Sequence, residues 1–442
     1  MNKTILIKNG RVVTGTGKVF ENGAVLIEGT KIKNVYSKTP AIKADKVIDA
    51  KNKVVMPGLI CAHHHLYSTM ARGMCPPGAP AKNFMEVLQR LWWRLDYSLS
   101  REDVLLSALV PLVECIKNGT TTIIDHHASP SCRDGSLEIL RGACEDAGIR
   151  ASLCYEVSDR NVKGGGLFES ERFLAELQRS PSELVTGLVG LHASFTVSDD
   201  SVKQCVKIAN KYGVGCHIHV AEDKSDREHC IKKYKVPVVK RLHKLGLLGK
   251  NSILVHCIWI DDSEMALIKK SDTIVVHNPE SNMNNAVGVS KALKMMQKGI
   301  LVGLGTDGMS SDMLSQMRCA YLLHRLDNHD PRVAFCEAPQ MLLENNREII
   351  KRVMGIDVGV IEKGKPADVI VVDYNPPTPF GADNFLGHFI FGMVDATVDT
   401  TIVNGRILME GKKVKSLNVE KIMERCRESA PKMWKRLRER FA

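Results

Sequence analysis

Short apolar runs separated by turn residues occur at both ends of the chain. They cover residues 5–7, 12–13, 25–27, 368–373, 394–398 and 400–403. Asn-Gly pairs, which favour hairpin turns, lie at positions 9–10, 22–23 and 404–405. Because an isolated set of short strands cannot bury its apolar face, we expect the two ends to pair. The pattern therefore predicts one small β-sandwich domain formed from residues 1–56 and 361–415.

The middle of the chain has a different pattern, in which β-rich runs alternate with helix-like stretches. The β-rich runs are residues 121–124, 185–191, 215–220, 252–256, 273–277 and 301–305, and helical stretches between them include 101–118, 136–147 and 201–211. Repeated strand–helix alternation over about 300 residues is typical of a parallel α/β domain, and this length suits a TIM barrel. We therefore predict a (β/α)8 TIM barrel over residues 57–360.

The last residues predict an amphipathic helix at 416–442. Met433, Trp434, Leu437 and Phe441 recur at helical spacing within a run rich in lysine and arginine. The chain of 442 residues carries a net charge of +11, but most basic residues are spread out rather than clustered. This distribution favours a docked terminal helix over a nucleic-acid-binding surface.

Composition excludes several classes of protein. No apolar run approaches the roughly 20 residues that a membrane helix needs, and the N-terminus lacks the pattern of a signal peptide. The 13 cysteines are scattered and form no C-x-x-C pair, which favours reduced packing thiols over disulfides or zinc clusters. We expect a cytoplasmic protein that binds neither membranes nor nucleic acid.

Polar residues that could hold a metal ion follow several predicted strands. His63 and His65 are two residues apart and can share one face of a strand, whereas His64 should point the other way. His217 and His219 alternate in the same manner, and Glu222 follows just past that strand. Asp307 lies among glycines after another strand. Three imidazoles and one carboxylate suit a divalent ion with room left for water. His256 also closes a strand, although a single histidine means little alone.

These motifs, in their order and spacing, resemble the amidohydrolase superfamily. The resemblance rests on residues 57–65, 216–222, 253–257, 303–307 and 359–370. Within the superfamily the match is to the cytosine-deaminase and chlorohydrolase-like branch, and closest to the SsnA group of aminohydrolases. The resemblance implies that one ion, Zn²⁺ with Fe²⁺ as the alternative, is held by His63, His65, His219 and Asp307.

The resemblance also implies catalytic and substrate-contacting residues. Glu222 matches a proton-shuttling glutamate, His256 matches a histidine near the attacking water, and Asp307 acts as ligand and proton acceptor. His192 matches a histidine that contacts substrate, and His277 matches a strand-end histidine to which no role is assigned. No lysine occupies the strand end at 187–194, so the bridging lysine of two-metal relatives is absent.

His126, His127 and Asp312 depart from the pattern common in the family. Together with His277 they add hydrogen-bonding groups near the expected pocket, and Trp93 or Trp92 could stack on a flat ring. His126 and His127 could equally make only loop hydrogen bonds, and at least one of the tryptophans could be core packing. We include His192, His126, His127, His277, Asp312 and Trp93 in the predicted substrate site.

Three functions are compatible with these residues. The first is hydrolytic deamination of a purine- or pyrimidine-like heterocycle by metal-activated water. The second is hydrolysis of a cyclic amide, which opens such a ring. The third is a non-enzymatic metal- or nucleic-acid-binding protein, which a proton shuttle such as Glu222 argues against. We predict the first, a hydrolase of a non-peptide carbon–nitrogen bond that acts on a small nitrogen heterocycle as a homo-oligomer, a dimer.

Overall fold

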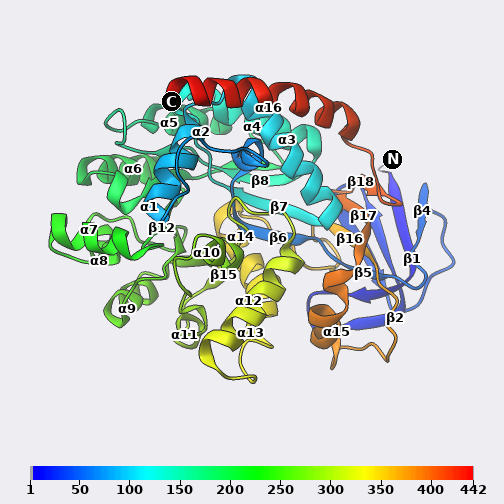
Figure 1. The fold of residues 1–442 in the computed structure, drawn as a ribbon. Coiled ribbons are helices and arrows are strands. Elements are labelled where there is room, and N and C mark those ends of the chain that lie inside the picture. Colours follow the sequence, from blue (N-terminus) through cyan, green and yellow to red (C-terminus); the bar gives the residue numbers. More distant parts are fainter. Residues whose placement is uncertain (1–2, 442) are drawn as a thin grey trace.

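Strands from both ends of the chain belong to one sheet in the computed structural model, which describes residues 3–441 (Figure 1). The strand order is β19-β18-β17-β16-β5-β1-β2-β3, with β4 beside β1. These strands are β1 (Thr4–Val13), β2 (Val19–Glu28), β3 (Lys31–Tyr36), β4 (Lys46–Asp49), β5 (Val54–Pro57), β16 (Val369–Asp373), β17 (Thr397–Val403), β18 (Arg406–Glu410) and β19 (Lys413–Val414). Residues 1, 2 and 442 of the predicted terminal segments lie outside the described part.

The two ends of the chain meet where β5 pairs with β16. The pairing is antiparallel, and Pro57 lies opposite Val369. Ile5, Ile7 and Val25 from the N-terminal strands share a buried apolar cluster with Val369 and Ile402. The apolar faces of the two terminal segments therefore cover each other, which neither could do alone.

A set of parallel strands fills the middle of the molecule. The strands are β6 (Leu59–His64), β7 (Thr120–Asp125), β8 (Arg150–Leu153), β9 (Glu156–Val157), β10 (Val185–Gly187), β11 (Val189–Ala193), β12 (Cys216–Val220), β13 (Ile253–His256), β14 (Ile274–His277) and β15 (Val302–Leu304). They pair in the orders β10-β8-β7-β6 and β15-β14-β13-β12-β11-β9. A parallel bridge between His64 and Asp307 brings the end of β6 beside the segment after β15.

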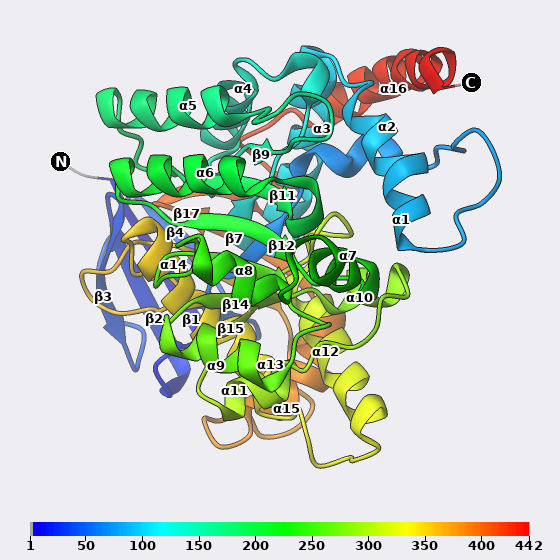
Figure 2. The ribbon, with the colours of Figure 1, turned by 90° about the vertical axis from the view of Figure 1, so that its left-hand side faces the viewer.

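Helices surround these strands (Figure 2). They are α3 (Arg101–Asn118), α4 (Ser136–Ala147), α5 (Leu167–Arg179), α6 (Asp199–Tyr212), α7 (Lys224–Tyr234), α8 (Val238–Lys244), α9 (Asp262–Lys270), α10 (Pro279–Asn284), α11 (Ala292–Gln297), α12 (Met313–Asn328), α13 (Glu337–Gln340) and α14 (Asn346–Met354). α3 illustrates how the sequence sets their limits. Ser100 and Asp103 form a capping box at its start, and Gly119 adopts a left-handed conformation at its end.

Single helical turns and a long terminal helix complete the fold. The short elements are η1 (Leu66–Ala71), α1 (Phe84–Val87), η2 (Leu88–Trp92), α2 (Trp93–Asp96), η3 (Pro130–Cys132), η4 (Ser194–Thr196), η5 (Met341–Asn345), α15 (Phe385–Phe391) and η6 (Met393–Asp395). α16 (Val419–Phe441) lies along α3, where Ser429 Oγ donates to Asp103 Oδ1 at 2.7 Å. Met433 and Leu437 on this helix are buried, as its amphipathic pattern requires.

Two global properties follow from the described residues. None of their helices is both long and apolar enough to span a bilayer. The 13 cysteines lie within the described range as free thiols, and most of them are buried. The packing of apolar side chains therefore carries the fold.

Candidate active site

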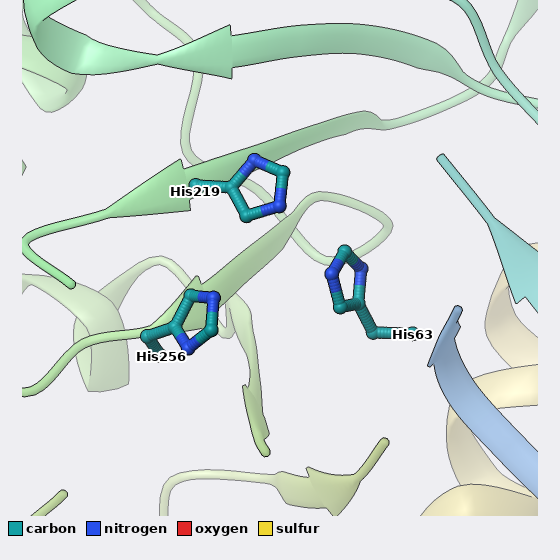
Figure 3. A group of neighbouring side chains, drawn as sticks. All are labelled: His63, His219 and His256. Carbon is teal, nitrogen blue, oxygen red and sulfur yellow. The ribbon is translucent and has the colours of Figure 1, made fainter. Parts of the chain in front are cut away.

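Side chains from the ends of several parallel strands converge at one point. The contributors are His63 on β6, His219 on β12, His256 on β13 and Asp307 after β15. The ring centroids of His63 and His219 lie 5.1 Å apart, and those of His219 and His256 lie 5.7 Å apart. Figure 3 shows the three imidazole rings grouped around a common space. Residues far apart in the sequence are thus neighbours because parallel strand ends share one edge.

The backbone around this point is strained. Ala221, His256 and Asp307 have φ angles of 45°, 69° and 55°, in the left-handed region that residues other than glycine rarely adopt. Such conformations persist where the surrounding structure holds them, and they often occur at functional sites. Gly305 also allows a close approach, since a Cβ there would lie 2.8 Å from the carbonyl oxygen of His63. The backbone is therefore crowded where Asp307 lies among glycines.

His65 and His219 turn acceptor nitrogens toward each other. The Nδ1 atom of His65 donates to the carbonyl of His126 at 2.5 Å, and Nδ1 of His219 donates to the carbonyl of His192 at 2.7 Å. In a neutral ring, the other nitrogen then carries a lone pair. The two Nε2 atoms lie 3.3 Å apart. Two lone pairs at this distance require a proton or a cation near them.

His63 and His256 also leave one ring nitrogen without a partner. The Nδ1 atom of His256 lies 2.8 Å from Asn282 Oδ1, to which it donates, and Nδ1 of His63 lies 2.9 Å from Nε2 of His217. The Nε2 atoms of both rings are buried and have no hydrogen-bond partner among residues 3–441. Buried polar atoms are rarely left unpaired, so this arrangement calls for a ligand.

Asp307 is the carboxylate of the cluster. Its Oδ1 atom lies 3.1 Å from His65 Nε2 and accepts from the amide of Gly308 at 2.7 Å, while Oδ2 accepts from Ser281 Oγ at 2.6 Å. Burial alone raises the pKa of this carboxyl. When no cation is bound, a proton on Nε2 of His65 is donated to Asp307, and this hydrogen bond and charge outweigh burial and lower the pKa of Asp307 below its usual range. Asp307 is therefore held as an anion at neutral pH.

Glu222 lies on the other side of His256. Its Oε2 atom is 3.4 Å from His256 Nε2, and Oε1 accepts a long hydrogen bond of 3.4 Å from Asn285. Burial, followed by the negative charge of Asp307, raises the pKa of Glu222 well above its ordinary value. A carboxyl group with a raised pKa can hold a proton at neutral pH and deliver it to a reacting atom.

The donor set fits a divalent metal ion. Neutral imidazole nitrogens with a carboxylate are the common ligands of zinc, and they must be deprotonated to bind it. The lone pairs of His65 and His219 and the unpartnered Nε2 atom of His63 meet that requirement. Possible ligand atoms lie within 4.8 Å of one another in four overlapping groups, which are His63–His219–His256, His65–His126–His219, His63–His65–Asp307 and Glu222–His256–Asp307. A metal ion at their shared centre would neutralise the facing acceptors.

A cavity that is partly open to solvent adjoins this cluster. His65, His219, Glu222 and Asp307 line one side of it. Apolar and aromatic residues line another side, namely Phe84, Leu88, Trp92, Trp93 and Phe195. The lining thus combines an aromatic, apolar part with a dense set of histidines and carboxyl groups, and apolar surface beside convergent polar groups is typical of sites for small molecules. A flat ring could lie against the aromatic side while its polar edge faces the histidines.

Of the residues that the sequence analysis expected to contact substrate, some line the cavity and others do not. His192 and Trp93 line the cavity, with their rings 6.2 Å apart. His126 donates to the carbonyls of Leu191 and His217, and His127 contacts Ser129 Oγ at 2.8 Å. Both side chains are fully buried, and neither is among the described residues that line the cavity. Loop hydrogen bonding is therefore what the structure shows for both.

His277 and Asp312 also differ from the expectation. His277 is fully buried, outside the described lining of the cavity, with its ring 5.1 Å from that of His324. Asp312 caps helix α12 by accepting from the amides of Leu314 and Ser315. Its carboxylate already has partners and lies in a different surface hollow. His64 points away, with Nε2 3.1 Å from Ser311 Oγ, as its place in the strand predicts.

Sequence reasoning did not identify three further carboxylates that line the cavity, Asp96, Glu156 and Asp226, of which the first two share contacts with Arg160. Asp96 ends α2, and Glu156 lies in β9. Arg160 contacts both and lies behind them. Neither carboxylate sits in a recognisable motif, and the distance between them in sequence gives no signal of contact. Ser281, Asn282 and Asn285 were also missed, although their position just after the strand that ends at His277 was a usable clue.

The chain is similar to known proteins over most of its length. The model of the amidohydrolase family matches residues 54–408. A 5-methylthioadenosine/S-adenosylhomocysteine deaminase of Thermococcus sibiricus is 33% identical over 414 residues, which are 92% of this chain and 94% of the relative. A 5'-deoxyadenosine deaminase of Methanosarcina barkeri is 31% identical over 438 residues, which are 97% of this chain and 98% of the relative.

Solved structures share the fold. An adenosine deaminase of Xanthomonas campestris with bound zinc superimposes with a TM-score of 0.85, at 22% identity, over 97% of this chain and 98% of that one. The atrazine chlorohydrolase of Arthrobacter aurescens in complex with zinc gives a TM-score of 0.84, at 22% identity, over 97% and 100%. With a family match over most of its length, and with relatives above 30% identity over more than nine-tenths of it, the chain belongs to the amidohydrolase family.

Proposed function

We propose that this amidohydrolase-family chain is a metal-dependent aminohydrolase that deaminates a purine-like heterocycle. The observation that carries the proposal is the position of Glu222, whose Oε2 atom lies 3.4 Å from His256 Nε2 beside the buried ligand set. A site that only bound metal would not need a protonated carboxyl there. The names of the curated relatives, which are deaminases of adenosine-type compounds, support the choice of a purine.

We propose His63, His65, His219 and Asp307 as the ligands of one divalent ion, Zn²⁺ with Fe²⁺ as the alternative. The converging lone pairs and the zinc-bound solved structures support this choice. When bound, such an ion lowers the pKa of water and polarises the group under attack. His217 and the carbonyls of His126 and His192 would hold the ligand rings in the orientation that leaves their Nε2 atoms free.

The remaining residues would move protons. Asp307 Oδ2 lies 3.7 Å from His256 Nε2, so both groups can orient one water and Asp307 can accept its proton. Glu222, whose burial favours the protonated form, would donate its proton to a ring nitrogen of the substrate. The proton that Asp307 takes from water would then pass to the departing amine, and Glu222 would regain a proton from the new hydroxyl group. Attack on the carbon that bears the amine, followed by loss of ammonia, completes hydrolysis. The aromatic side of the cavity, including Trp93, would hold the ring flat and exclude water.

A panel of heterocycles tests this function. Purified protein, stripped of metal and reloaded with zinc, is mixed with adenine nucleosides, aminopyrimidines and aminotriazines, and ammonia release is followed together with the product mass. We expect ammonia from an adenine-type compound in the zinc-loaded protein only. A product that has gained one water, with no ammonia released, would replace deamination by opening of a cyclic amide. No reaction with any member would reject both.

The architecture is also part of the proposal. We propose that the parallel strands close into a (β/α)8 barrel and that the sheet built from both termini forms a separate β-sandwich domain. The bridge between His64 and Asp307, which links the first and last parallel strands, supports closure. The separate apolar cluster of the terminal strands supports a second domain.

A further inference from the structure

Asp96 and Glu156 form an acidic wall of the cavity whose role is not explained by the chemistry above. Both side chains are more than nine-tenths buried, and both line the cavity. His192 lies between Glu156 and the ligand cluster. The Oε1 atom of Glu156 is 3.8 Å from His192 Nε2, and the ring centroids of His192 and His219 are 6.0 Å apart. A substituent on a ring held at the cluster could therefore reach this wall.

Arg160 is the cation that faces these two carboxylates. Its Nη2 atom donates to Glu156 Oε1 at 2.7 Å, and its contacts with Asp96 Oδ2 are longer, at 3.4 Å. The guanidinium also stacks on Trp93, with 4.9 Å to the ring centroid, and lies outside the lining of the cavity. The two carboxylates line the cavity and Arg160 does not. The positive charge of Arg160 is shared by the two carboxylates.

Part of this acidic pair is left without a partner. The Oδ1 atom of Asp96 is buried and accepts no hydrogen bond from residues 3–441. Burial raises the pKa of both carboxyls, and the charge of Arg160 offsets that rise only in part. A buried carboxyl oxygen without a donor is costly, so the wall is completed when a ligand supplies N–H or O–H groups there.

The remaining charges of the cavity have the same sign. Its carboxyl groups come from Asp96, Glu156, Glu222, Asp226 and Asp307, of which Glu222 is held in the protonated form, and no lysine or arginine is part of its lining in the described chain. This contrasts with the whole chain, whose net charge is +11. A single divalent ion would balance two of these groups at most. An anionic substituent would therefore find no partner, whereas a cationic one would find several.

We infer that Asp96 and Glu156 form a subsite for a positively charged, N–H-bearing substituent, such as an ammonium or amidinium group, on the heterocycle. This inference rests on the proposed function, because it extends the substrate of the same site. A charge-assisted hydrogen bond from the substituent to Asp96 Oδ1 fills its missing contact, and the second acid shares the charge. Neutral substrates lack that charge, and carboxylate-bearing substrates are repelled.

Three compounds with the same aminopurine ring and the same short chain test the inference. The chain ends in an ammonium, a hydroxyl or a carboxylate group. Binding to the zinc-loaded protein is measured by calorimetry at neutral pH, and ammonia release is followed separately. We expect the ammonium compound to bind about tenfold more tightly than the hydroxyl compound, and the carboxylate compound to bind most weakly.

Variants of the two carboxylates test whether Asp96 and Glu156 cause the preference for the ammonium compound. Asp96→Asn should reduce the ratio of ammonium to hydroxyl affinity to near one. Asp262→Asn, a matched change at an exposed carboxylate paired with Lys294, should leave that ratio unchanged. If Asp96→Asn does not fold, Glu156→Gln replaces it, and an unchanged ratio in that variant would contradict the inference.

The two proposals fail separately. Equal or tighter binding of the hydroxyl or carboxylate compound overturns the acidic subsite, even if ammonia is released. Preferential binding of the ammonium compound without ammonia release supports the subsite and counts against deamination alone. A preference that persists unchanged in both Asp96→Asn and Glu156→Gln also overturns it.

Discussion

The Nδ1 atom of His63 lies 2.9 Å from the Nε2 atom of His217, and both rings are fully buried. A chain of contacts continues from His217 Nδ1 to the sulfur of Cys154 at 3.6 Å, and from that thiol to the carbonyl of Asp125 at 3.3 Å. The carbonyl can only accept, so the thiol donates to it and its sulfur accepts from His217. His217 Nε2 then accepts from His63, which leaves His63 Nε2 as a lone pair.

This chain predicts that His217 sets the metal affinity without contacting the ion. His217→Ala should weaken zinc binding by about 10- to 100-fold, the usual cost of removing the partner of a ligating histidine. Competition with a chelating dye measures the dissociation constant. His243→Ala, at an exposed position on α8, is the control. An unchanged zinc affinity in His217→Ala would show that His217 only packs.

A single metal ion per chain is expected, because His63, His65, His219 and Asp307 converge on one centre. Elemental analysis of gently purified protein should give one equivalent of a divalent metal, and His63→Ala combined with His65→Ala should abolish retention. His126→Ala should keep the metal, since its Nε2 atom already donates to two carbonyls. Two ions per chain, or loss of the ion in His126→Ala, would contradict this ligand set.

Glu222 is expected to act as a proton donor and not as a ligand. Glu222→Gln keeps the size of the side chain but cannot carry the proton, so kcat should fall by about 100-fold or more while zinc content stays at the wild-type level. Glu228→Gln, on the exposed face of α7 where Glu228 pairs with Lys224, should change neither. Loss of zinc in Glu222→Gln would instead make Glu222 a ligand.

Arg150 joins the parallel strands to the terminal sheet. Its guanidinium donates to both oxygens of Asp368, at 2.7 and 3.0 Å, and both side chains are almost fully buried. Arg150→Ala leaves a buried carboxylate unpaired and should lower the free energy of unfolding by about 3–5 kcal/mol, measured by urea denaturation. Arg332→Ala, which breaks an exposed pair with Asp330, should change the free energy of unfolding little. Similar losses in both variants would contradict the special role of Arg150.

Asp312 is expected to stabilise α12 rather than bind substrate. Asp312→Ala removes the cap and should lower the free energy of unfolding by about 0.5–2 kcal/mol, with KM and kcat unchanged. Asp327→Ala, at an exposed position near the C-terminus of the same helix, is the control. It removes a negative charge from the end where the helix dipole disfavours one, so it should not destabilise the helix. A rise in KM in Asp312→Ala would restore the substrate role expected from the sequence.

The sequence by itself determined which residues end the parallel strands and which of them can share a face. His63, His65, His219, Glu222, His256 and Asp307 were predicted from strand ends together with the resemblance to the amidohydrolase superfamily, and the structure brings these side chains close together. The direction of His64 follows from strand periodicity. The capping residues of α3 and the amphipathic pattern of α16 are likewise local properties of the chain.

Only the tertiary structure decided which other side chains face the cavity. Asp96 and Glu156 lie 60 residues apart in the sequence, yet both line the cavity and contact Arg160, whereas Asp312, near the metal motif in sequence, turns back to cap its own helix. His126 and His277 are strand-end residues, but neighbouring backbone and side chains enclose them. The positions of strands along the chain depend on short-range sequence patterns. The lining of a cavity depends on how separate segments pack against one another.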